Sequence, residues 1–254
     1  MDVQKLLVAK NMHTKITINR NCFDNLDTDE KILFIQCWNI NHQIEIVSNT
    51  LHATVNLVDK SNGIEKLAQI TQLVFLYCQF AGILYEAWNS IQNSYYSTKL
   101  SQRYHDKLST NTQEELKKLR QYFAKKNFVS ELRNKFSFHY DRNKIQEGLN
   151  ILKPTENIEI LLPDRNGSSF CAQASTVVSA SILNTICSND FPSALKMLYD
   201  ELLHNVHFWI NDFCNNYCAL ICEKCGVANR EPLGIQFEIK LDDLVLPYFT
   251  NKDS

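Results

Sequence analysis

The stretch "DEKILFIQCWNINHQIEIVSNTLHATVNLV", residues 29–58, decides the fold class of this chain. Its apolar side chains recur every three or four residues, which is the spacing of one face of an α-helix. Asp27 or Thr28 is placed to cap the start of this helix, and the turn sequence "DKSNG" at residues 59–63 marks its end. The apolar members of the pattern are Ile32, Phe34, Ile35, Trp38, Ile40, Ile44, Ile46, Val47 and Leu51. The stretch therefore predicts one long helix.

A second long helix is predicted to follow the turn, over residues 64–94. It contains the most apolar window of the chain, "LVFLYCQFAGILYEAW" at residues 73–88, which Gln79 interrupts and which reaches Glu86 near its end. That window is shorter than the roughly 20 apolar residues that a membrane-spanning helix needs, so we expect a buried core helix. Two long helices joined by a short turn predict an antiparallel helical hairpin.

Four further helices are predicted, one over "STVVSASILNTI" at residues 175–186 and three from their start and stop signals. Thr112 and Glu115 form an S/T-x-x-E capping box that predicts a short basic helix. Ser130 is placed to cap a helix that runs to about Leu152. A long helix is expected over residues 192–225, with Gly226 as its C-terminal cap.

The whole chain, residues 1–254, is predicted to form a single, mainly α-helical domain. Only six glycines and five prolines are present, which favours helices over sheets rich in turns. Residues 1–28 form an N-terminal extension, and residues 154–176 predict a small β-hairpin insertion, because a turn cluster there separates two β-branched runs. Residues 227–254 predict an extended or docked C-terminal tail. The expected architecture is a helical bundle with these additions.

The composition of the chain restricts the classes of function that we expect for it. The net charge of −2 gives no global basic field, so a site for a polyanion has to be a local patch. Nine cysteines without an apolar export segment indicate a reducing compartment, so we expect a cytoplasmic protein that is not bound to a membrane. The sequence has no phosphate-binding loop, G-x-S-x-G or H-E-x-x-H motif, and we expect neither a cofactor nor a metal.

The segment "LRNKFSFHYD", residues 132–141, carries the candidate catalytic residues Arg133, Asn134 and His139. A histidine near its ordinary pKa can take or give a proton during cleavage of an RNA phosphodiester. An arginine can hold the phosphate and stabilise its developing charge, and Asn134 can orient either group. On one straight helix Arg133 and His139 are about 120° apart, so a two-fold dimer that shares a cleft brings them together more readily.

Basic residues near this segment are the candidate RNA-binding residues. Lys135, His139 and Arg142 would share one stripe of a continuous helix, and Lys144 would point away from it, as Arg133 does. We predict that Lys135, Arg142 and Lys144 contact RNA. A second basic run precedes the segment and is read either as a solvated helix face or as a surface that steers phosphates. Its members are Lys117, Lys118, Arg120, Lys125 and Lys126.

The motif "RNKFSFH", residues 133–139, resembles the Arg-x(4–6)-His signature of the HEPN superfamily, in which a polar residue, often Asn, follows the arginine. The resemblance covers the motif and, loosely, the helices up to Leu152. It implies an all-α homodimer whose paired motifs form a metal-independent endoribonuclease site, with Glu45 as a candidate supporting acid. Other members of that superfamily are non-catalytic scaffolds or partners of antitoxin-like proteins. The stretch is also similar to segments of uncharacterised bacterial helical proteins.

A structural alternative stays open for each of these features. Arg133 can pair with an acid on a neighbouring helix while His139 packs, which would make the protein a non-catalytic module that binds a partner protein through its cysteine-lined helix and its tail. The cysteine-lined face can fill a helix interface, contribute to a metal site or carry redox chemistry. Its members are Cys214, Cys218, Cys222 and Cys225.

Overall fold

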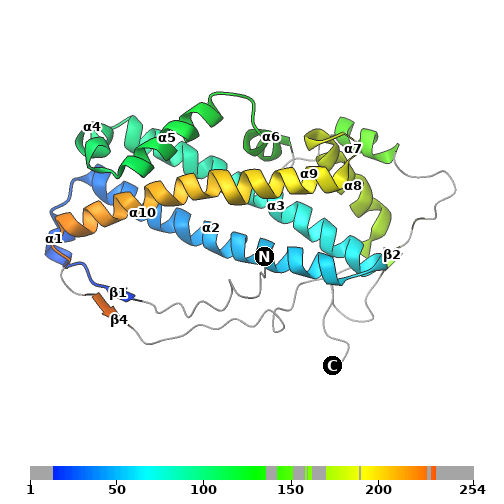
Figure 1. The fold of residues 1–254 in the computed structure, drawn as a ribbon, viewed down its shortest axis with the longest axis horizontal. Coiled ribbons are helices and arrows are strands. Elements are labelled where there is room, and N and C mark those ends of the chain that lie inside the picture. The colour runs from blue at the N-terminus through cyan, green and yellow to red at the C-terminus, as the bar shows by residue number, and fades with distance from the viewer. Residues whose placement is uncertain are drawn as a thin grey trace.

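Three long helical rods form the body of the protein (Figure 1). The computed structural model describes residues 14–135, 142–150, 158, 160–161, 170–188, 190–227 and 230–232. The first two rods are α2 (Thr28–Lys60) and α3 (Gly63–Ile91), the latter extended by the π-helical turn η2 (Gln92–Tyr96). The third runs without a break through α9 (Phe191–Leu198), the π-helical segment η4 (Tyr199–Val206) and α10 (His207–Lys224). The protein is mainly helical, as the sequence predicts.

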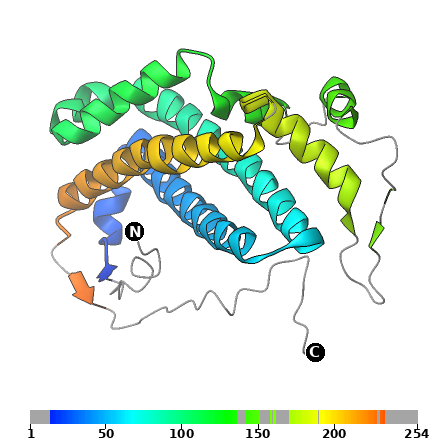
Figure 2. The ribbon, with the colours of Figure 1, turned by 45° about the vertical axis from the view of Figure 1, so that its right-hand side comes forward.

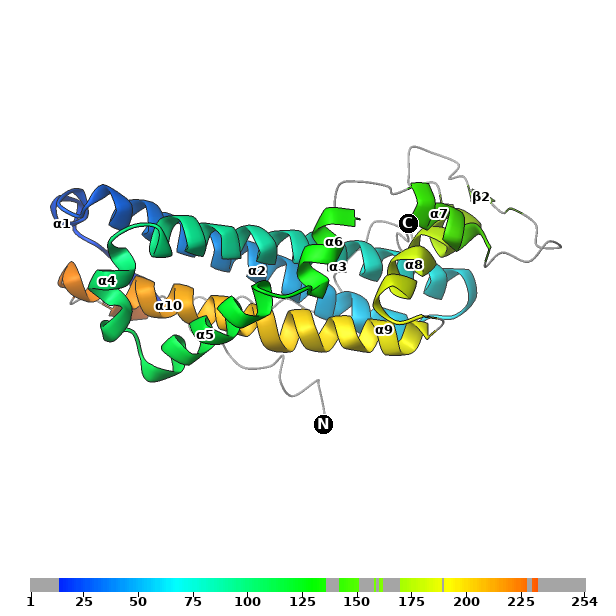
Figure 3. The ribbon, with the colours of Figure 1, turned by 90° about the horizontal axis from the view of Figure 1, so that it is seen from above.

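Shorter helices cover one side and both ends of this body. Figure 3 shows α5 lying along α10 and α6 running across α3, and Figure 2 shows α7 beside α8 at the far end. The elements on this side are α4 (Leu100–Tyr104), η3 (His105–Lys107), α5 (Thr110–Phe123) and α6 (Phe128–Lys135). Those at the ends are α1 (Arg20–Asp24), α7 (Arg142–Leu149) and α8 (Ala172–Ile186).

Two short antiparallel strand pairs complete the described structure. Strand β2 (Ile160–Leu161) pairs with β3 (Phe170–Cys171), which lies within the segment where the sequence predicts a hairpin. Helix α8 already begins at Ala172, so the insertion ends earlier than residue 176. Strand β1 (Thr14–Ile16) pairs with β4 (Arg230–Pro232), so the N-terminal extension and the start of the C-terminal tail are held together.

The hairpin of α2 and α3 forms as the sequence predicts, with a tighter turn. Only Ser61 and Asn62 separate the two helices, and Gly63 adopts a φ of +56°, which favours glycine because a Cβ is strained there. The two helices pack along their length and against α10. Tyr77, Phe80 and Leu84 of the window 73–88 are fully buried between them.

The rod that contains α3 also has the length and composition of a membrane span. It runs over residues 63–96, and 61% of its most apolar window is buried in the structure. The helix is therefore longer than the window 73–88 suggests, and the length argument against a membrane span does not hold for it. Core helices of soluble proteins meet the same criteria, and the burial of this helix fits that role.

The C-terminal end of α10 confirms the predicted glycine cap. Gly226 has a φ of +62°. Its amide donates to the Glu223 carbonyl at 2.9 Å, and the Val227 amide donates to the Cys222 carbonyl at 3.2 Å. These two bonds are those of a Schellman motif, which satisfies carbonyl groups that the end of a helix leaves free.

The predicted N-terminal caps of two helices are displaced by three residues. Ser109, not Thr112, caps α5, and its hydroxyl accepts from the Thr112 amide at 3.1 Å. The Thr112 hydroxyl is instead buried and donates to Asp212 of α10 at 2.5 Å. Asn127, not Ser130, caps α6, because its side chain accepts from the Ser130 amide at 2.8 Å. In both cases the residue taken for the cap lies in the first turn.

A buried carboxylate ties α2 to α4 and α10. Glu30 is fully buried and closes the first turn of α2 by accepting from the Asp27 amide at 3.0 Å. It also accepts from Arg103 at 2.9 Å, from Tyr104 at 2.5 Å and from Lys224 at 2.8 Å on each oxygen. Both carboxylate oxygens are thus compensated by charged donors, which is what a buried charge requires.

The helix predicted to run unbroken to Leu152 is described as two helices with different neighbours. Helix α6 packs on α3, whereas α7 packs on α8, and residues 136–141 between them lie outside the described residues. Gly148 explains the close approach of α7. A Cβ added at Gly148 would lie 2.5 Å from the carbonyl oxygen of Val177 in α8, a distance that side chains do not tolerate.

We expect Gly148→Ala to lower the free energy of unfolding by about 1–3 kcal/mol, because α7 has to move off the backbone of α8. Gln146→Ala on the same helix is the control, since Gln146 is exposed and its truncation should change stability by less than about 0.5 kcal/mol. Urea unfolding followed by circular dichroism measures both. Equal midpoints for Gly148→Ala and the parent protein would contradict the close packing of α7 on α8.

Candidate nucleic-acid interface

Arg133 lies on α6, where its guanidinium faces the outer side of α3. Its Nη2 is 3.2 Å from Oε1 of Glu86, and its Nη1 donates to Oδ1 of Asn134 at 3.1 Å. The guanidinium carbon also lies 4.9 Å from the centre of the Tyr85 ring. Helix α6 is held in place by Val129 and Leu132, which are both fully buried. Arg133 is therefore positioned by one carboxylate, one amide and one aromatic face.

The ion pair of Arg133 remains open to solvent. The side chain of Arg133 is 40% exposed and that of Glu86 is 60% exposed. An exposed pair of this kind contributes about 0–1 kcal/mol, so it costs little to exchange the carboxylate for another anion. The partner of Arg133 is nevertheless an acid on a neighbouring helix. This is the arrangement expected if Arg133 has a structural role and no catalytic one.

The other predicted site residues are only partly placed. His139 lies outside the described residues, and the side chains of Lys135 and Lys144 do as well, although their backbones belong to α6 and α7. Arg142 is exposed at the first residue of α7. Arg133 and Arg142 therefore lie on helices with different neighbours, α6 on α3 and α7 on α8, and the residues that join these helices lie outside the described part of the chain.

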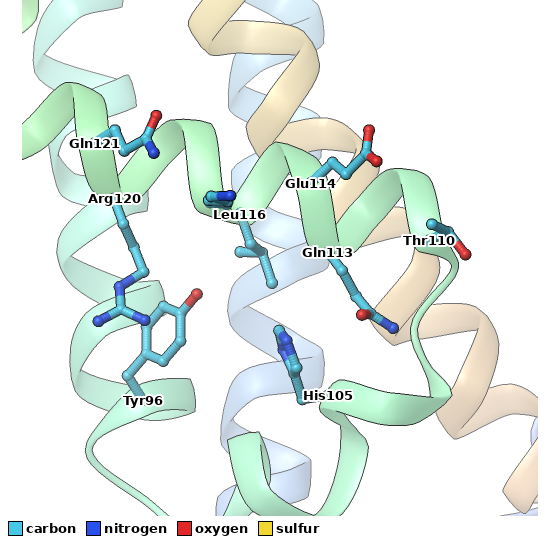
Figure 4. A pocket seen from close by; sticks show the side chains of 9 residues that line it. Tyr96, His105, Thr110, Gln113, Glu114, Leu116, Arg120 and Gln121 are labelled. Atoms are coloured by element: carbon cyan, nitrogen blue, oxygen red, sulfur yellow. The ribbon is translucent and has the colours of Figure 1, made fainter.

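A hollow of about 510 Å³ opens between α5 and the turns η2 and η3 (Figure 4). Arg120 from α5 lies against Tyr96 from η2, with its guanidinium carbon 5.1 Å from the ring centre, and His105 points from η3 toward α5, near Leu116. Lys117 lines the same hollow, and Glu114 is its one acidic residue. Burial raises the pKa of Tyr96 and outweighs the opposing effect of Arg120, so this phenol stays neutral. The hollow combines cations with an aromatic ring.

A second hollow of about 410 Å³ lies beside the first, between the end of α5 and the long rod of η4 and α10. It is lined by the aromatic rings of Tyr122 and Trp209, which contact each other edge to face at 6.0 Å. Its cations are Lys118, Lys125 and Lys126. Glu201 is the acid in its lining.

All of these cations are exposed, and two of them pair with acidic residues. Lys118 is 3.0 Å from Glu115, and Lys126 is 3.2 Å from Glu131. Lys117, Arg120 and Lys125 are exposed on the surface. Gln121 lines both hollows, so they are adjacent along α5. We call this surface the α5 face and define it by Tyr96, Lys117, Arg120, Tyr122, Lys125 and Trp209. It is a local basic patch on a chain of net negative charge.

The cysteine-lined helix is a packing interface in the part that the structure describes. Cys214 and Cys218 are buried against Cys37 of α2, and burial raises the pKa of the Cys37 thiol well above its usual range. Cys225 is also buried, and burial raises its pKa to about 11, which keeps the thiol protonated and disfavours redox chemistry. Across the described residues, no group of three or more His, Cys, Asp or Glu side chains is placed to hold a metal.

The histidines of the long rods and Glu45 do not join Arg133. His52 of α2 contacts Tyr199 of η4, with Nδ1 3.4 Å from the phenol oxygen, and burial lowers the pKa of His52. Burial likewise lowers the pKa of His207, which packs edge to face on Phe80. Glu45 is exposed on α2. The acid that lies next to Arg133 is Glu86 of α3. The sequence singles out Glu86 only as the charged residue near the end of the apolar window 73–88.

No protein-family model, curated protein or solved structure matches this chain.

Proposed function

We propose that this protein binds single-stranded RNA along the α5 face, and that Arg133 and His139 form a HEPN-type endoribonuclease site in a homodimer. The observation that carries the proposal is the pair of adjacent hollows on α5, which exposed cations and partly exposed aromatic rings line together. We further propose a cytoplasmic location, which follows from the free thiols and would give access to cellular RNA.

The charge distribution supports binding to a phosphate backbone. Lys117, Arg120 and Lys125 are exposed, and Lys118 and Lys126 pair with Glu115 and Glu131. Neutralising phosphates releases counterions, and this is the main source of sequence-independent affinity for nucleic acids. A chain with a net charge of −2 gains such affinity only where its cations are gathered, as they are on α5.

The aromatic rings support a single-stranded ligand. Tyr96, Tyr122 and Trp209 are partly exposed in the two hollows, and stacking of a base on such a ring contributes about 1–3 kcal/mol. Bases within a duplex are already stacked and cannot enter the hollows. An unpaired strand can place its bases there and its phosphates against the cations of α5.

Cleavage would use Arg133 and His139 without a metal. His139 would take the proton from a 2′-hydroxyl or give one to the leaving 5′-oxygen, and Arg133 would hold the phosphate in place of its present partner, Glu86. Helix α6 follows α5 directly, so a strand on the α5 face can continue toward Arg133. Lys135, Arg142 and Lys144 stay as proposed RNA contacts.

Replacing Lys117, Arg120 and Lys125 together with alanine is expected to weaken RNA binding. The slope of log Kd against log salt should fall by about 2, because each lost phosphate contact removes about 0.7. The measurement is fluorescence anisotropy with a labelled unstructured RNA at several salt concentrations.

The matched control for this experiment replaces Lys60, Lys66 and Lys196 with alanine. These lysines are exposed on α2, α3 and α9, away from α5, and the control changes the net charge by the same amount. Equal loss of affinity in the two triple variants would show that total charge, and not the α5 face, governs binding. That result would overturn the proposal.

The second candidate function is a non-catalytic helical module that binds a partner protein. The observation that favours it is the ion pair of Arg133 with Glu86 on a neighbouring helix, supported by the stacking of Arg133 on Tyr85. In this case Arg133 attaches α6 to α3 and has no role toward a substrate. The protein partner would replace RNA as the ligand, and no variant of Arg133 would change a chemical rate.

A further inference from the structure

One face of α2 exposes four large apolar side chains, with the exposed His42 between the third and the fourth. Ile32 is 46% exposed, Ile35 57%, Trp38 48% and Ile46 53%. At 100° per residue these four positions fall within an arc of about 120°, so they form one stripe that points away from the core. We call this stripe the α2 outer face. The opposite side of the same helix buries Leu33, Ile44 and Leu51 completely, among other residues.

Such a stripe is unusual on an uncovered helix. Single exposed apolar side chains are common, but a contiguous apolar patch normally marks a surface that something else covers. The three isoleucines and the tryptophan are spread along about 21 Å of helix, at 1.5 Å per residue from Ile32 to Ile46. The occupant therefore has to be an extended or elongated apolar element.

A shallow hollow connects this face to the β1–β4 pair. It has a volume of about 170 Å³ and lies between α2 and α10, where Trp38, Cys218 and Val227 line it together with Ile16 of β1. Ile16 pairs with Arg230 of β4. The described part of the chain ends at Pro232, which pairs with Thr14, two residues from Ile16.

The sequence of that segment has the pattern of an occupant. Residues 233–249 read "LGIQFEIKLDDLVLPYF", and the apolar residues alternate with other residues at its start. They are Leu233, Ile235, Phe237, Ile239 and Leu241. In an extended chain, residues two apart point to the same side, so this segment can present one apolar edge. At about 3.3 Å per residue its reach is about 56 Å, more than the stripe requires.

We propose that residues 233–249 of the same chain cover the α2 outer face, with the apolar edge of the segment against Ile32, Ile35, Trp38 and Ile46. Strand β4, the element directly before this segment, pairs with β1, whose Ile16 lines a hollow with Trp38. A segment tethered by a few residues has an effective concentration in the millimolar range, which favours it over a second copy of the chain at micromolar concentration.

Photo-crosslinking tests this proposal in the full chain. Ile35 is replaced by benzoylphenylalanine, which the exposure of this position should tolerate, and the protein is irradiated at micromolar concentration. We expect the main product to migrate at monomer mass and to contain a peptide from residues 233–249. The same label at Phe75, which is 58% exposed on α3, is the matched control and should not give that peptide.

A second variant makes the result specific to the apolar edge of the segment. Phe237→Asp combined with Ile239→Asp is expected to abolish the cross-link from position 35, because charged side chains do not pack on the stripe. A cross-linked product at dimer mass would assign the face to a second copy instead. That product, the absence of any cross-link to residues 233–249, or an equal yield from position 75 would overturn the proposal.

Discussion

Replacing Glu30 with glutamine is expected to lower the free energy of unfolding by about 3 kcal/mol at neutral pH. Glutamine has nearly the same shape, so the variant removes the charge without leaving a cavity. Lys224 and Arg103 then lose a charged acceptor, and one donor of the new amide faces the ammonium of Lys224. Hydrogen bonds to charged groups contribute about 1.5–3 kcal/mol each, and breaking a buried pair costs about 3–5 kcal/mol.

The effect of this substitution should depend on pH in a defined direction. Burial alone would raise the pKa of Glu30, but hydrogen bonds from Lys224, Tyr104, the Asp27 amide and Arg103 outweigh it and lower the pKa from 4.5 to about 2. Because the pKa is lower in the folded state, the stabilisation is complete above about pH 5 and is lost as the pH falls from 4.5 toward 2. This difference in pKa between the unfolded and the folded state corresponds to about 3 kcal/mol of stability, which is the same size as the loss expected for Glu30→Gln.

Urea unfolding at pH 7, 5 and 3.5 measures the prediction, with the parent protein and Glu30→Gln compared at each pH. The difference between them should shrink at the lowest pH. Glu45→Gln is the control on the same helix, since Glu45 is exposed and should change stability by less than about 0.5 kcal/mol at any pH. A pH-independent difference for Glu30→Gln would mean that the charge of Glu30 does not hold α2, α4 and α10 together.

Replacing His139 with alanine is expected to reduce RNA cleavage by about 10²–10⁴-fold, if the protein is the ribonuclease that we propose, because the proton transfer to and from the RNA oxygens loses its catalyst. Cleavage by the parent protein should proceed in the presence of a metal chelator. Binding of RNA should persist in His139→Ala, since the α5 face is unchanged. The measurement is the rate of cleavage of a labelled RNA, with the affinity and the dimer mass determined in parallel.

Two substitutions at the Arg133–Glu86 pair separate a catalytic arginine from a structural one. Arg133→Ala and Glu86→Gln both remove the same exposed ion pair, so they should have similar small effects on stability, within about 1 kcal/mol. If Arg133 holds the phosphate, Arg133→Ala abolishes cleavage while Glu86→Gln preserves it. Equal rates in both variants, or cleavage that survives His139→Ala, would exclude this site and favour the non-catalytic module.

The helical hairpin was predictable because its signals are local. The apolar spacing of residues 29–58 and the turn before Gly63 are properties of contiguous residues, and they specify helices whatever the rest of the chain does. The same holds for Gly226, because a left-handed residue after a helix favours glycine. The buried positions of Cys214 and Cys218 follow from their spacing along one helical face.

The errors came from features that depend on distant residues. Thr112 has the sequence of a cap, but Asp212 of α10 takes its hydroxyl into the core and Ser109 caps α5 instead. The sequence also does not show that the two described parts of the helix expected to Leu152 rest on different neighbours, α6 on α3 and α7 on α8. Periodicity shows which side of a helix is apolar, but it does not show which helix that side meets.

The candidate site shows the same division between features set by neighbouring residues and features set by distant ones. The sequence by itself determined the mainly helical class, the α2–α3 hairpin and the basic character of the segment that leads to Arg133. Only the tertiary structure placed Glu86 beside Arg133, set Tyr96 and Trp209 around the cations of α5, and buried Glu30 among donors from two other helices. The reason is physical: helix spacing is fixed by hydrogen bonds between near neighbours, whereas these contacts join residues that only the packing of the core brings together.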